Sequence, residues 1–379
     1  MRLAFVNGKI FTGNEFIQGK AVVVDNGVIH SMVPEMILDS SFERIDLGGN
    51  ILAPAFMDIQ VYGGNGKLFS EFPSVEAVKS TYASCLEGGA THILPTISTN
   101  TLELMLEGIE AVRAYWKQGG SKGVMGVHLE GPWLSVSKKG AHREDCIRKP
   151  TRQEVEKLLE VGKDVIKLIT LAPEECDEEI IDILKGNGIA ISAGHSNASY
   201  EQGVNGFRKI GLATHLFNAM SPFQHRAPGM VGAIYDSPTV SASVVADGHH
   251  VDFSVIRISK QLMGPRLFLI TDAVTESFQG HYQHRLQGDK YVLPNGTLSG
   301  SSLTMMKAVR NCVEKIGISL EESLRMGSLY PAKAIKMDSS LGRIENGYVA
   351  DLVEIGPQLE VKEVYVAGAP MRKLLPAMS

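Results

Sequence analysis

Apolar and polar positions alternate over short distances at both ends of the chain. Strand-forming residues flank glycines in "FVNGKIF" (5–11) and "VVVDNGVIH" (22–30), and again in "LGRIENGYVADLVEIG" (341–356). The first two segments each contain an Asn-Gly pair, which favours a type I′ hairpin because that turn needs positive φ at two successive residues. We therefore predict β structure at both ends, with a hairpin at each of these two Asn-Gly pairs.

Neither end of the chain has enough residues to bury a sheet face by itself. We therefore expect the two ends to pair into one small discontinuous β-sandwich domain, formed by residues 1–53 and 336–379. The remaining residues, 54–335, would then be inserted between the two halves of that domain.

The middle of the chain has a different pattern, in which apolar runs alternate with amphipathic helices, as in a parallel β/α array. Eight runs are candidate strands: 54–61, 90–97, 123–130, 165–172, 188–195, 211–217, 239–246 and 266–273. Eight units of this kind over roughly 250–280 residues predict an α/β fold, a TIM (β/α)8 barrel. A doubly wound sheet is the competing architecture, but no Gly-x-Gly-x-x-Gly opens a helix after the first run.

The helix starts in this region carry capping-box sequences. Three pairs have the right spacing: Thr151/Glu154, Ser199/Gln202 and Ser319/Glu322. In a capping box each side chain accepts from the other residue's backbone N–H, so we expect reciprocal hydrogen bonds at all three.

Composition and charge exclude several classes of function. The 379 residues have a formal net charge of -5, which offers no basic surface for nucleic acid. No apolar run reaches the roughly 20 residues that a membrane span needs, and the N-terminus carries no secretory apolar region, so we expect a cytoplasmic protein. Four cysteines without a Cys-x-x-Cys pair indicate neither a disulfide framework nor a thiolate zinc site.

Four chemically active residues end four of the predicted strands: Glu130, His195, His215 and Asp272. Catalytic groups of a TIM barrel project from the carboxyl ends of its strands, so these four should meet at one mouth. Two imidazoles and a carboxylate suit a divalent ion such as zinc, and three protein ligands with an open position are typical of catalytic sites.

The role of Asp272 has three interpretations at this point: a fourth metal ligand, a structural strand cap, or a general base. A carboxylate at the end of an otherwise apolar strand needs a partner. Metal-activated water would supply one, so we favour the general base.

Several longer strings resemble those of the N-acetylglucosamine-6-phosphate deacetylases, which belong to the amidohydrolase superfamily. The strings are "HLEGPW", "SAGHS", "ATHLFNAM", "RAPGMVGA", "ADGHHVD", "LITDA" and "LSGSSLTM", and the likeness extends over the whole chain. The resemblance implies a metal-dependent deacetylase that converts N-acetylglucosamine 6-phosphate to glucosamine 6-phosphate and acetate.

The resemblance also bears on the number of metal ions. Many amidohydrolases hold a second ion with a His-x-His pair on the first barrel strand, where this chain has Gln60 and Tyr62. We therefore expect one divalent ion, held by Glu130, His195 and His215, with zinc favoured and iron, manganese, cobalt or nickel as alternatives. Gln60 and Tyr62 are expected to line the pocket, and a further weak site stays open.

Substrate contacts are likewise implied by the resemblance. A sugar phosphate needs cationic or backbone N–H donors, and the matching positions are Asn218, the amide of Ala219, Arg226 and His250. His142, in the long polar loop after the third strand, matches a residue that orients the acetyl carbonyl. Arg226 corresponds to a loop that reaches a neighbouring subunit, so a homodimer or larger homo-oligomer is expected.

The remaining histidines are not expected to bind metal or substrate. His128 should lie on the same strand face as Glu130 and is expected to be a core or supporting residue rather than a ligand. His225, His281 and His284 occur in polar loops and receive no role.

Other functions stay open on the sequence alone. The same site could serve N-acetylgalactosamine 6-phosphate or a cyclic amide. A catalytically silent amidohydrolase-like assembly protein is the alternative from another class, although a scaffold has no need for converging buried ionisable groups.

Overall fold

The computed structural model describes residues 2–371 of the chain. Its contacts divide these residues into two compact units, one of residues up to 57, 85–92 and from 304 onward, the other of residues 58–84 and 93–303. Among the residues described, no helix combines the length and the apolar character that crossing a membrane requires. The domain boundaries predicted at 53/54 and 335/336 stay a prediction.

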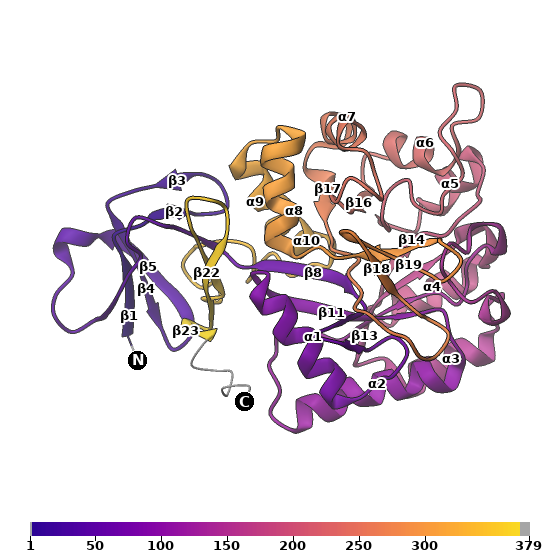
Figure 1. Ribbon diagram of the computed structural model, residues 1–379, viewed down its shortest axis with the longest axis horizontal. Helices are drawn as coiled ribbons and strands as arrows, with labels where there is room; N and C mark the ends of the chain where they lie inside the picture. Colours follow the sequence, from indigo (N-terminus) through magenta and orange to yellow (C-terminus); the bar gives the residue numbers. More distant parts are fainter. Residues whose placement is uncertain (1, 372–379) are drawn as a thin grey trace. The chain divides into compact units, whose positions relative to one another are not determined.

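The first unit contains two β-sheets built from both ends of the chain. A four-stranded sheet has the order β5-β4-β1-β6, and Figure 1 shows β1, β4 and β5 side by side. A six-stranded sheet has the order β23-β22-β21-β7-β2-β3. The strands are β1 Arg2–Val6, β2 Lys9–Phe11, β3 Phe16–Ile17, β4 Lys20–Asp25, β5 Val28–Pro34, β6 Glu43–Asp46, β7 Ile51–Pro54, β21 Leu352–Ile355, β22 Val361–Val366 and β23 Ala369–Pro370.

The predicted pairing of the two chain ends is confirmed. Strand β7 pairs antiparallel with β21, so that Leu52 lies opposite Glu354 in the six-stranded sheet. Apolar side chains of both sheets form one core, which includes Phe5, Val22 and Leu352. The unit is therefore a small sandwich whose sheets share a single hydrophobic layer.

The two Asn-Gly pairs of the N-terminal region behave differently. Asn26 and Gly27 both have positive φ and close the hairpin between β4 and β5. The hairpin predicted at Asn7 and Gly8 is wrong, because β1 and β2 belong to different sheets. Asn7 has positive φ but Gly8 does not, and a type I′ turn needs it at both positions.

The barrel consists of eight strands in the order β17-β16-β15-β14-β13-β12-β11-β8. A parallel bridge between Val61 and Ala273 joins the first strand to the chain after the eighth and closes the ring. The strands are β8 Phe56–Val61, β11 Ala90–Ser98, β12 Val127–Glu130, β13 Ile166–Leu171, β14 Ala190–Ala193, β15 Leu212–Ala213, β16 Ser241–Val244 and β17 Leu267–Leu269. All eight predicted strands are present, and the TIM barrel is confirmed.

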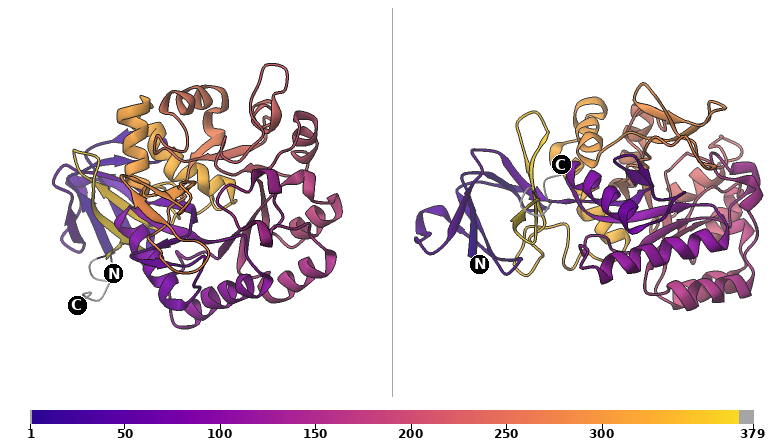
Figure 2. Two further views of the ribbon diagram at one scale, coloured as in Figure 1. Left: turned by 45° about the vertical axis from the view of Figure 1, so that its right-hand side comes forward. Right: turned by 60° about the horizontal axis from the view of Figure 1, so that its bottom comes forward.

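Helices α2 to α7 cover the outside of the strand ring (Figures 1 and 2). Their bounds, with those of the other helices, are α1 Val75–Glu87, α2 Leu102–Lys117, α3 Arg152–Gly162, α4 Glu178–Gly186, α5 Tyr200–Gly206, α6 Gly229–Asp236, α7 Phe253–Met263, α8 Met305–Asn311, α9 Leu320–Gly327 and α10 Leu329–Ala334. A π-helical segment, Cys312–Ile316, continues α8.

Short elements complete the chain. Two antiparallel pieces, β9 Gly63–Gly64 and β10 Lys67–Leu68, follow the first barrel strand, and a three-stranded sheet of β18 Arg285–Gln287, β19 Lys290–Val292 and β20 Leu298–Ser301 follows the eighth. The 3₁₀ turns are Glu35–Ile37, Val136–Lys138, Glu144–Cys146, Pro173–Glu175 and Gly264–Arg266.

The capping prediction is confirmed in full at one helix. At α5, Ser199 and Gln202 each accept from the other's backbone N–H. At α3 and α9, Thr151 and Ser319 accept from the N–H three residues on. For those two helices the part of the chain described here shows only this half of the box.

Candidate metal centre and active site

Three barrel strands carry the predicted metal ligands to one place. Glu130 is the last residue of β12, while His195 and His215 each lie two residues beyond the ends of β14 and β15. All three side chains are buried, and one ligand atom from each lies within 4.8 Å of the other two. Parallel strands that end at the same rim bring together residues far apart in sequence.

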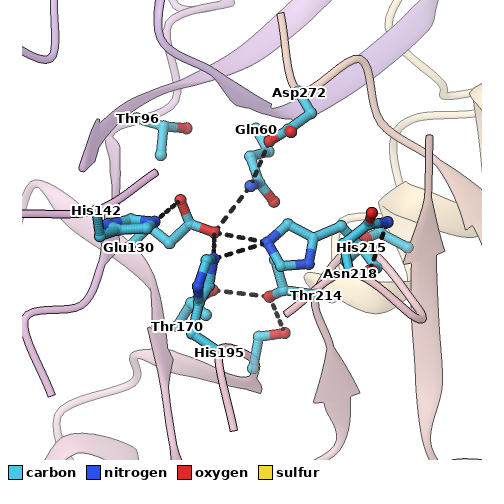
Figure 3. Close-up of polar contacts among 12 residues, drawn as sticks. Gln60, Thr96, Glu130, His142, Thr170, His195, Thr214, His215, Asn218 and Asp272 are labelled. Atoms are coloured by element: carbon cyan, nitrogen blue, oxygen red, sulfur yellow. Dashed lines mark hydrogen bonds and ion pairs between the residues drawn. The ribbon is translucent and has the colours of Figure 1, made fainter. Parts of the chain in front are cut away.

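The donor atoms of these residues form a compact triangle (Figure 3). Oε1 of Glu130 lies 2.9 Å from Nε2 of His215 and 3.2 Å from Nε2 of His195. The two Nε2 atoms are 3.1 Å apart. Ligands about 2.0 Å from a tetrahedral metal are separated by about 3.3 Å, so the residues fit a small divalent cation with little rearrangement.

Hydrogen bonding prepares His195 as a ligand. Its Nδ1 lies 2.8 Å from the carbonyl oxygen of Lys138, to which it must donate, so Nε2 carries the free lone pair. Burial lowers the pKa of His195 to about 4, which keeps the ring neutral. A neutral imidazole with its lone pair facing the cluster is the form that binds metal.

The charge of Glu130 is also set by its surroundings. Burial alone would raise the pKa of Glu130, but the adjacent His142 holds it well below the usual range. Burial would lower the pKa of His215, yet its hydrogen bond to Glu130 raises it. A proton and a cation therefore compete for Nε2 of His215, so metal binding at this site should weaken at low pH.

The backbone at the strand ends is strained. His195, His215 and Asp272 have φ of 47°, 33° and 54°, in the left-handed region that side chains with a Cβ rarely adopt. Such residues cost about 1–3 kcal/mol each and persist where the surroundings impose them. Here the left-handed residues lie two or three positions beyond the strand ends, at the rim where the active groups gather.

Asp272 lies beside the cluster, three residues beyond the end of β17. Its Oδ1 accepts a hydrogen bond of 2.8 Å from the side-chain nitrogen, Nε2, of Gln60. Its Oδ2 lies 3.4 Å from Nε2 of His250, whose Nδ1 is 2.6 Å from Oδ2 of Asp247. Two partners therefore fix the carboxylate in one orientation.

Of the pair formed by His250 and Asp247, the sequence predicted only His250 as a site residue. Burial alone would lower the pKa of His250, but the hydrogen bond to Asp247 and the nearby Asp272 raise it to about 9. Sequence reasoning missed Asp247, although it precedes His250 by three residues within the same string, "ADGHH". That spacing was the signal that could have indicated the contact.

His142 contacts the cluster from the loop after β12. The backbone N–H of Thr99 donates to its Nδ1 at 3.1 Å, so the ring proton must be on Nε2. That nitrogen lies 3.1 Å from Oε2 of Glu130. His142 thus presents a donor at the wall of the pocket.

Gln60 and Tyr62 both contact Glu130, and of the two Tyr62 lines the pocket. The amide nitrogen of Gln60 also lies 3.1 Å from Oε1 of Glu130, and the hydroxyl of Tyr62 donates to Oε2 of the same carboxylate. The expectation that both residues line the pocket therefore holds for Tyr62, whereas Gln60 is outside the lining and contacts Glu130 and Asp272.

The residues beneath the cluster are joined by hydroxyl groups. The hydroxyl oxygen of Thr214 lies 2.7 Å from that of Thr170 and 2.6 Å from that of Ser192. The hydroxyl oxygen of Thr170 lies 2.8 Å from Nε2 of His128. Nδ1 of His128 contacts the carbonyl oxygen of Ile59 at 3.0 Å. Both ring nitrogens are satisfied, so His128 is a supporting core residue, as its place on the strand indicated.

One pocket contains most of the predicted site. Its lining includes Glu130, His142, His195, His215, Asn218, Ala219, His250 and Asp272. Arg226 is exposed on the loop before α6 and is not part of this lining. Tyr282 and His284 also line the pocket, and they were missed because a polar loop carries no periodic signal that says which way its side chains point.

Comparisons with known proteins identify related sequences over nearly the whole chain. The sequence profile of the Amidohydrolase family matches residues 51–371, and that of the NagA composite domain matches residues 3–52. The chain is similar to N-acetylglucosamine-6-phosphate deacetylase of Haemophilus influenzae, with 35% identity covering 97% of this chain and 99% of the relative. It is 33% identical to N-acetylgalactosamine-6-phosphate deacetylase of a Shewanella species, covering 95% of this chain and 93% of that protein.

Solved structures give the same result. The crystal structure of N-acetylglucosamine-6-phosphate deacetylase from Pasteurella multocida superposes with a TM-score of 0.93 at 38% identity, covering 98% of this chain and 99% of the other. The match extends over both β-rich ends and the barrel. The chain therefore belongs to the amidohydrolase family, alongside the N-acetylglucosamine-6-phosphate deacetylases.

Proposed function

We propose that this protein hydrolyses the acetamide of N-acetylglucosamine 6-phosphate to glucosamine 6-phosphate and acetate. The observation that carries the proposal is the meeting of the donor triangle of Glu130, His195 and His215 with Asp272 in one pocket. Relatives named for this activity are similar over nearly the whole chain, which supports the same substrate class.

The family implies a divalent metal, and the donor triangle fits one. We infer one ion per subunit, with zinc favoured by two imidazoles and a carboxylate, and iron, manganese, cobalt or nickel as alternatives. When bound, such an ion polarises the acetyl oxygen and makes water a better nucleophile.

Asp272 is the proposed general base and acid. It accepts the proton of the attacking water and delivers it to the departing amine, so that the amine leaves uncharged. The contacts of its two oxygens with Gln60 and His250 hold the carboxylate toward the pocket during both transfers.

Four residues of the pocket wall are the proposed substrate contacts. The Nε2 proton of His142, which lies 3.1 Å from Oε2 of Glu130 without substrate, would be shared with the developing negative charge on the acetyl oxygen. Asn218, the backbone amide of Ala219 and the cationic ring of His250 suit the hydroxyl and phosphate oxygens of the sugar.

Arg226 has a separate part in the proposal. Because its side chain is exposed and outside the pocket lining of its own chain, we propose that it reaches the phosphate in a neighbouring subunit of a homodimer or larger homo-oligomer. The cytoplasmic location expected from the sequence stays a prediction.

The test is acetate release from a panel of amino sugars, with metal analysis of the same preparation. We expect turnover of N-acetylglucosamine 6-phosphate, little turnover of the sugar without phosphate, and about one divalent ion per chain. Metal-free protein that forms defined oligomers and releases no acetate would instead support the silent assembly protein.

N-acetylgalactosamine 6-phosphate is the second candidate substrate. The 33% identity to the Shewanella enzyme named for it is only slightly below that to the Haemophilus enzyme. Comparing kcat/KM for the two epimers in the same assay separates these candidates.

A further inference from the structure

The two polar residues at the end of the first barrel strand contact the carboxylates of Glu130 and Asp272. Gln60 and Tyr62 lie two positions apart, so both side chains point to the inside of the barrel. The side-chain nitrogen of Gln60 is 2.7 Å from the hydroxyl of Tyr62, 3.1 Å from Oε1 of Glu130 and 2.8 Å from Oδ1 of Asp272. The Tyr62 hydroxyl in turn contacts Oε2 of Glu130.

Counting donors and acceptors fixes the direction of these bonds. The two carboxylates can only accept, so the atom of Gln60 that faces them must be its NH₂ group. The Tyr62 hydroxyl donates its one proton to Oε2 of Glu130, and the two N–H groups of Gln60 are shared among three acceptors, Oε1 of Glu130, Oδ1 of Asp272 and the hydroxyl oxygen of Tyr62.

The consequence is that the two oxygens of Glu130 have different surroundings. Oε2 receives hydrogen bonds from Tyr62 and from Nε2 of His142. Oε1 faces His195 and His215, the other corners of the donor triangle, and has one longer contact of 3.1 Å with the side-chain nitrogen of Gln60. A carboxylate that is free to rotate could offer both oxygens to a cation, whereas this one offers a single oxygen.

The ring of Tyr62 is itself held in place. Its side chain is only 5% exposed and packs in a cluster with Leu68, Val274 and Tyr282. The position of the hydroxyl is therefore set by apolar packing that does not depend on the metal.

We infer that Tyr62, together with Gln60, is a positioning residue that orients Glu130 so that only Oε1 binds the ion. Gln60 also places an amide donor between the carboxylates of Glu130 and Asp272, where a second cation would otherwise be attracted. This inference rests on the proposed function for its metal, and it assigns a new role to two residues outside the ligand set.

The main test is Tyr62→Phe, which removes the hydroxyl and leaves the packed ring. Groups that orient a metal ligand typically contribute about 10- to 100-fold to metal affinity, so the variant should lose its ion correspondingly faster to a competing chelator. Loaded with cobalt, it should show a weaker visible band than the wild type, because a Glu130 that binds through both oxygens raises the coordination number.

Tyr115→Phe is the matched control. Tyr115 lies on α2, is 4% exposed and uses its hydroxyl to accept from the backbone N–H of Ser121 at 2.9 Å. The same atom is removed from a buried tyrosine outside the pocket, so cobalt spectrum and chelator kinetics should match those of the wild type.

Gln60→Glu tests the second half of the inference. The change is nearly isosteric but replaces the bridging donor by a third carboxylate beside Glu130 and Asp272. We expect the metal content at saturation to rise above one ion per chain. A content that stays at one would overturn the role given to Gln60.

The outcomes separate this inference from the proposed function. A wild-type protein that binds no divalent ion and releases no acetate contradicts the proposed function. A wild type that binds and turns over, with Tyr62→Phe unchanged in both chelator kinetics and cobalt spectrum, overturns the inference alone.

Discussion

Nε2 of His250 lies 3.4 Å from Oδ2 of Asp272, and both side chains are nearly inaccessible to solvent. The other oxygen of Asp272 accepts from Gln60, so the carboxylate is held between a cationic ring and an amide. This arrangement orients the proposed proton acceptor, and the group of residues that could hold a metal ion does not include it. Its role can therefore be separated experimentally from metal binding.

The variant Asp272→Asn should keep the metal and lose most of its turnover. An amide has nearly the same shape as the carboxylate but cannot accept the proton of water, and general acid–base groups typically contribute about 10²–10⁴-fold to rate. Metal analysis and kcat, measured on the same preparation, check both parts. A kcat near that of the wild type would contradict the role given to Asp272.

The variant Asp247→Asn should change the pH dependence of stability. The pKa of His250 is raised to about 9 in the folded protein, above the value of about 6.5 expected in the unfolded chain. Between these values the folded state holds a proton that the unfolded state releases, so the free energy of unfolding falls as pH rises from about 6.5 through 9. Below about 6.5 this contribution is fully present.

Removing the carboxylate of Asp247 removes the hydrogen bond that raises the pKa of His250. The decline in stability should then end at a lower pH than in the wild type. Urea unfolding of both proteins at a series of pH values, with chelator present throughout, measures this. Parallel curves for the two proteins would show that Asp247 does not control the proton on His250.

Metal should stabilise the fold through His195. A ligand that binds only the folded state adds about 2.7 kcal/mol at a free concentration 100 times its Kd. The Tm of the metal-free wild type should therefore rise as zinc is added, whereas His195→Ala should show a much smaller rise. An equal rise in both proteins would indicate that zinc binds elsewhere.

Arg226 offers a test of the proposed contact between subunits. If Arg226 serves a neighbouring site, an Arg226→Ala chain keeps an intact pocket of its own and needs only an arginine from its partner. An Asp272→Asn chain has a defective pocket but can supply that arginine. Mixed oligomers of the two inactive variants should then recover activity, up to about half of the wild-type sites in a dimer. An arginine that acts in its own chain would give no recovery on mixing.

Periodicity and strand-end chemistry were readable in the sequence because both are local or follow from a general rule of barrels. Apolar runs identified all eight barrel strands, and the residues that end them include Glu130, His195 and His215, which the structure brings together. Resemblance to a family then indicated the substrate class. These features depend on residue type and order, which a sequence states directly.

Only the tertiary structure decided the contacts between residues far apart in the chain. Asn7 and Gly8 have the composition of a hairpin, yet the chain there passes from one sheet to the other, because burial of two sheets against each other outweighs local turn preference. Likewise, the sequence shows Tyr62 as a missing ligand, whereas the fold places its hydroxyl on Glu130, 68 residues away. Such hydrogen bonds depend on the rotation and register of neighbouring strands, which packing sets and local sequence does not.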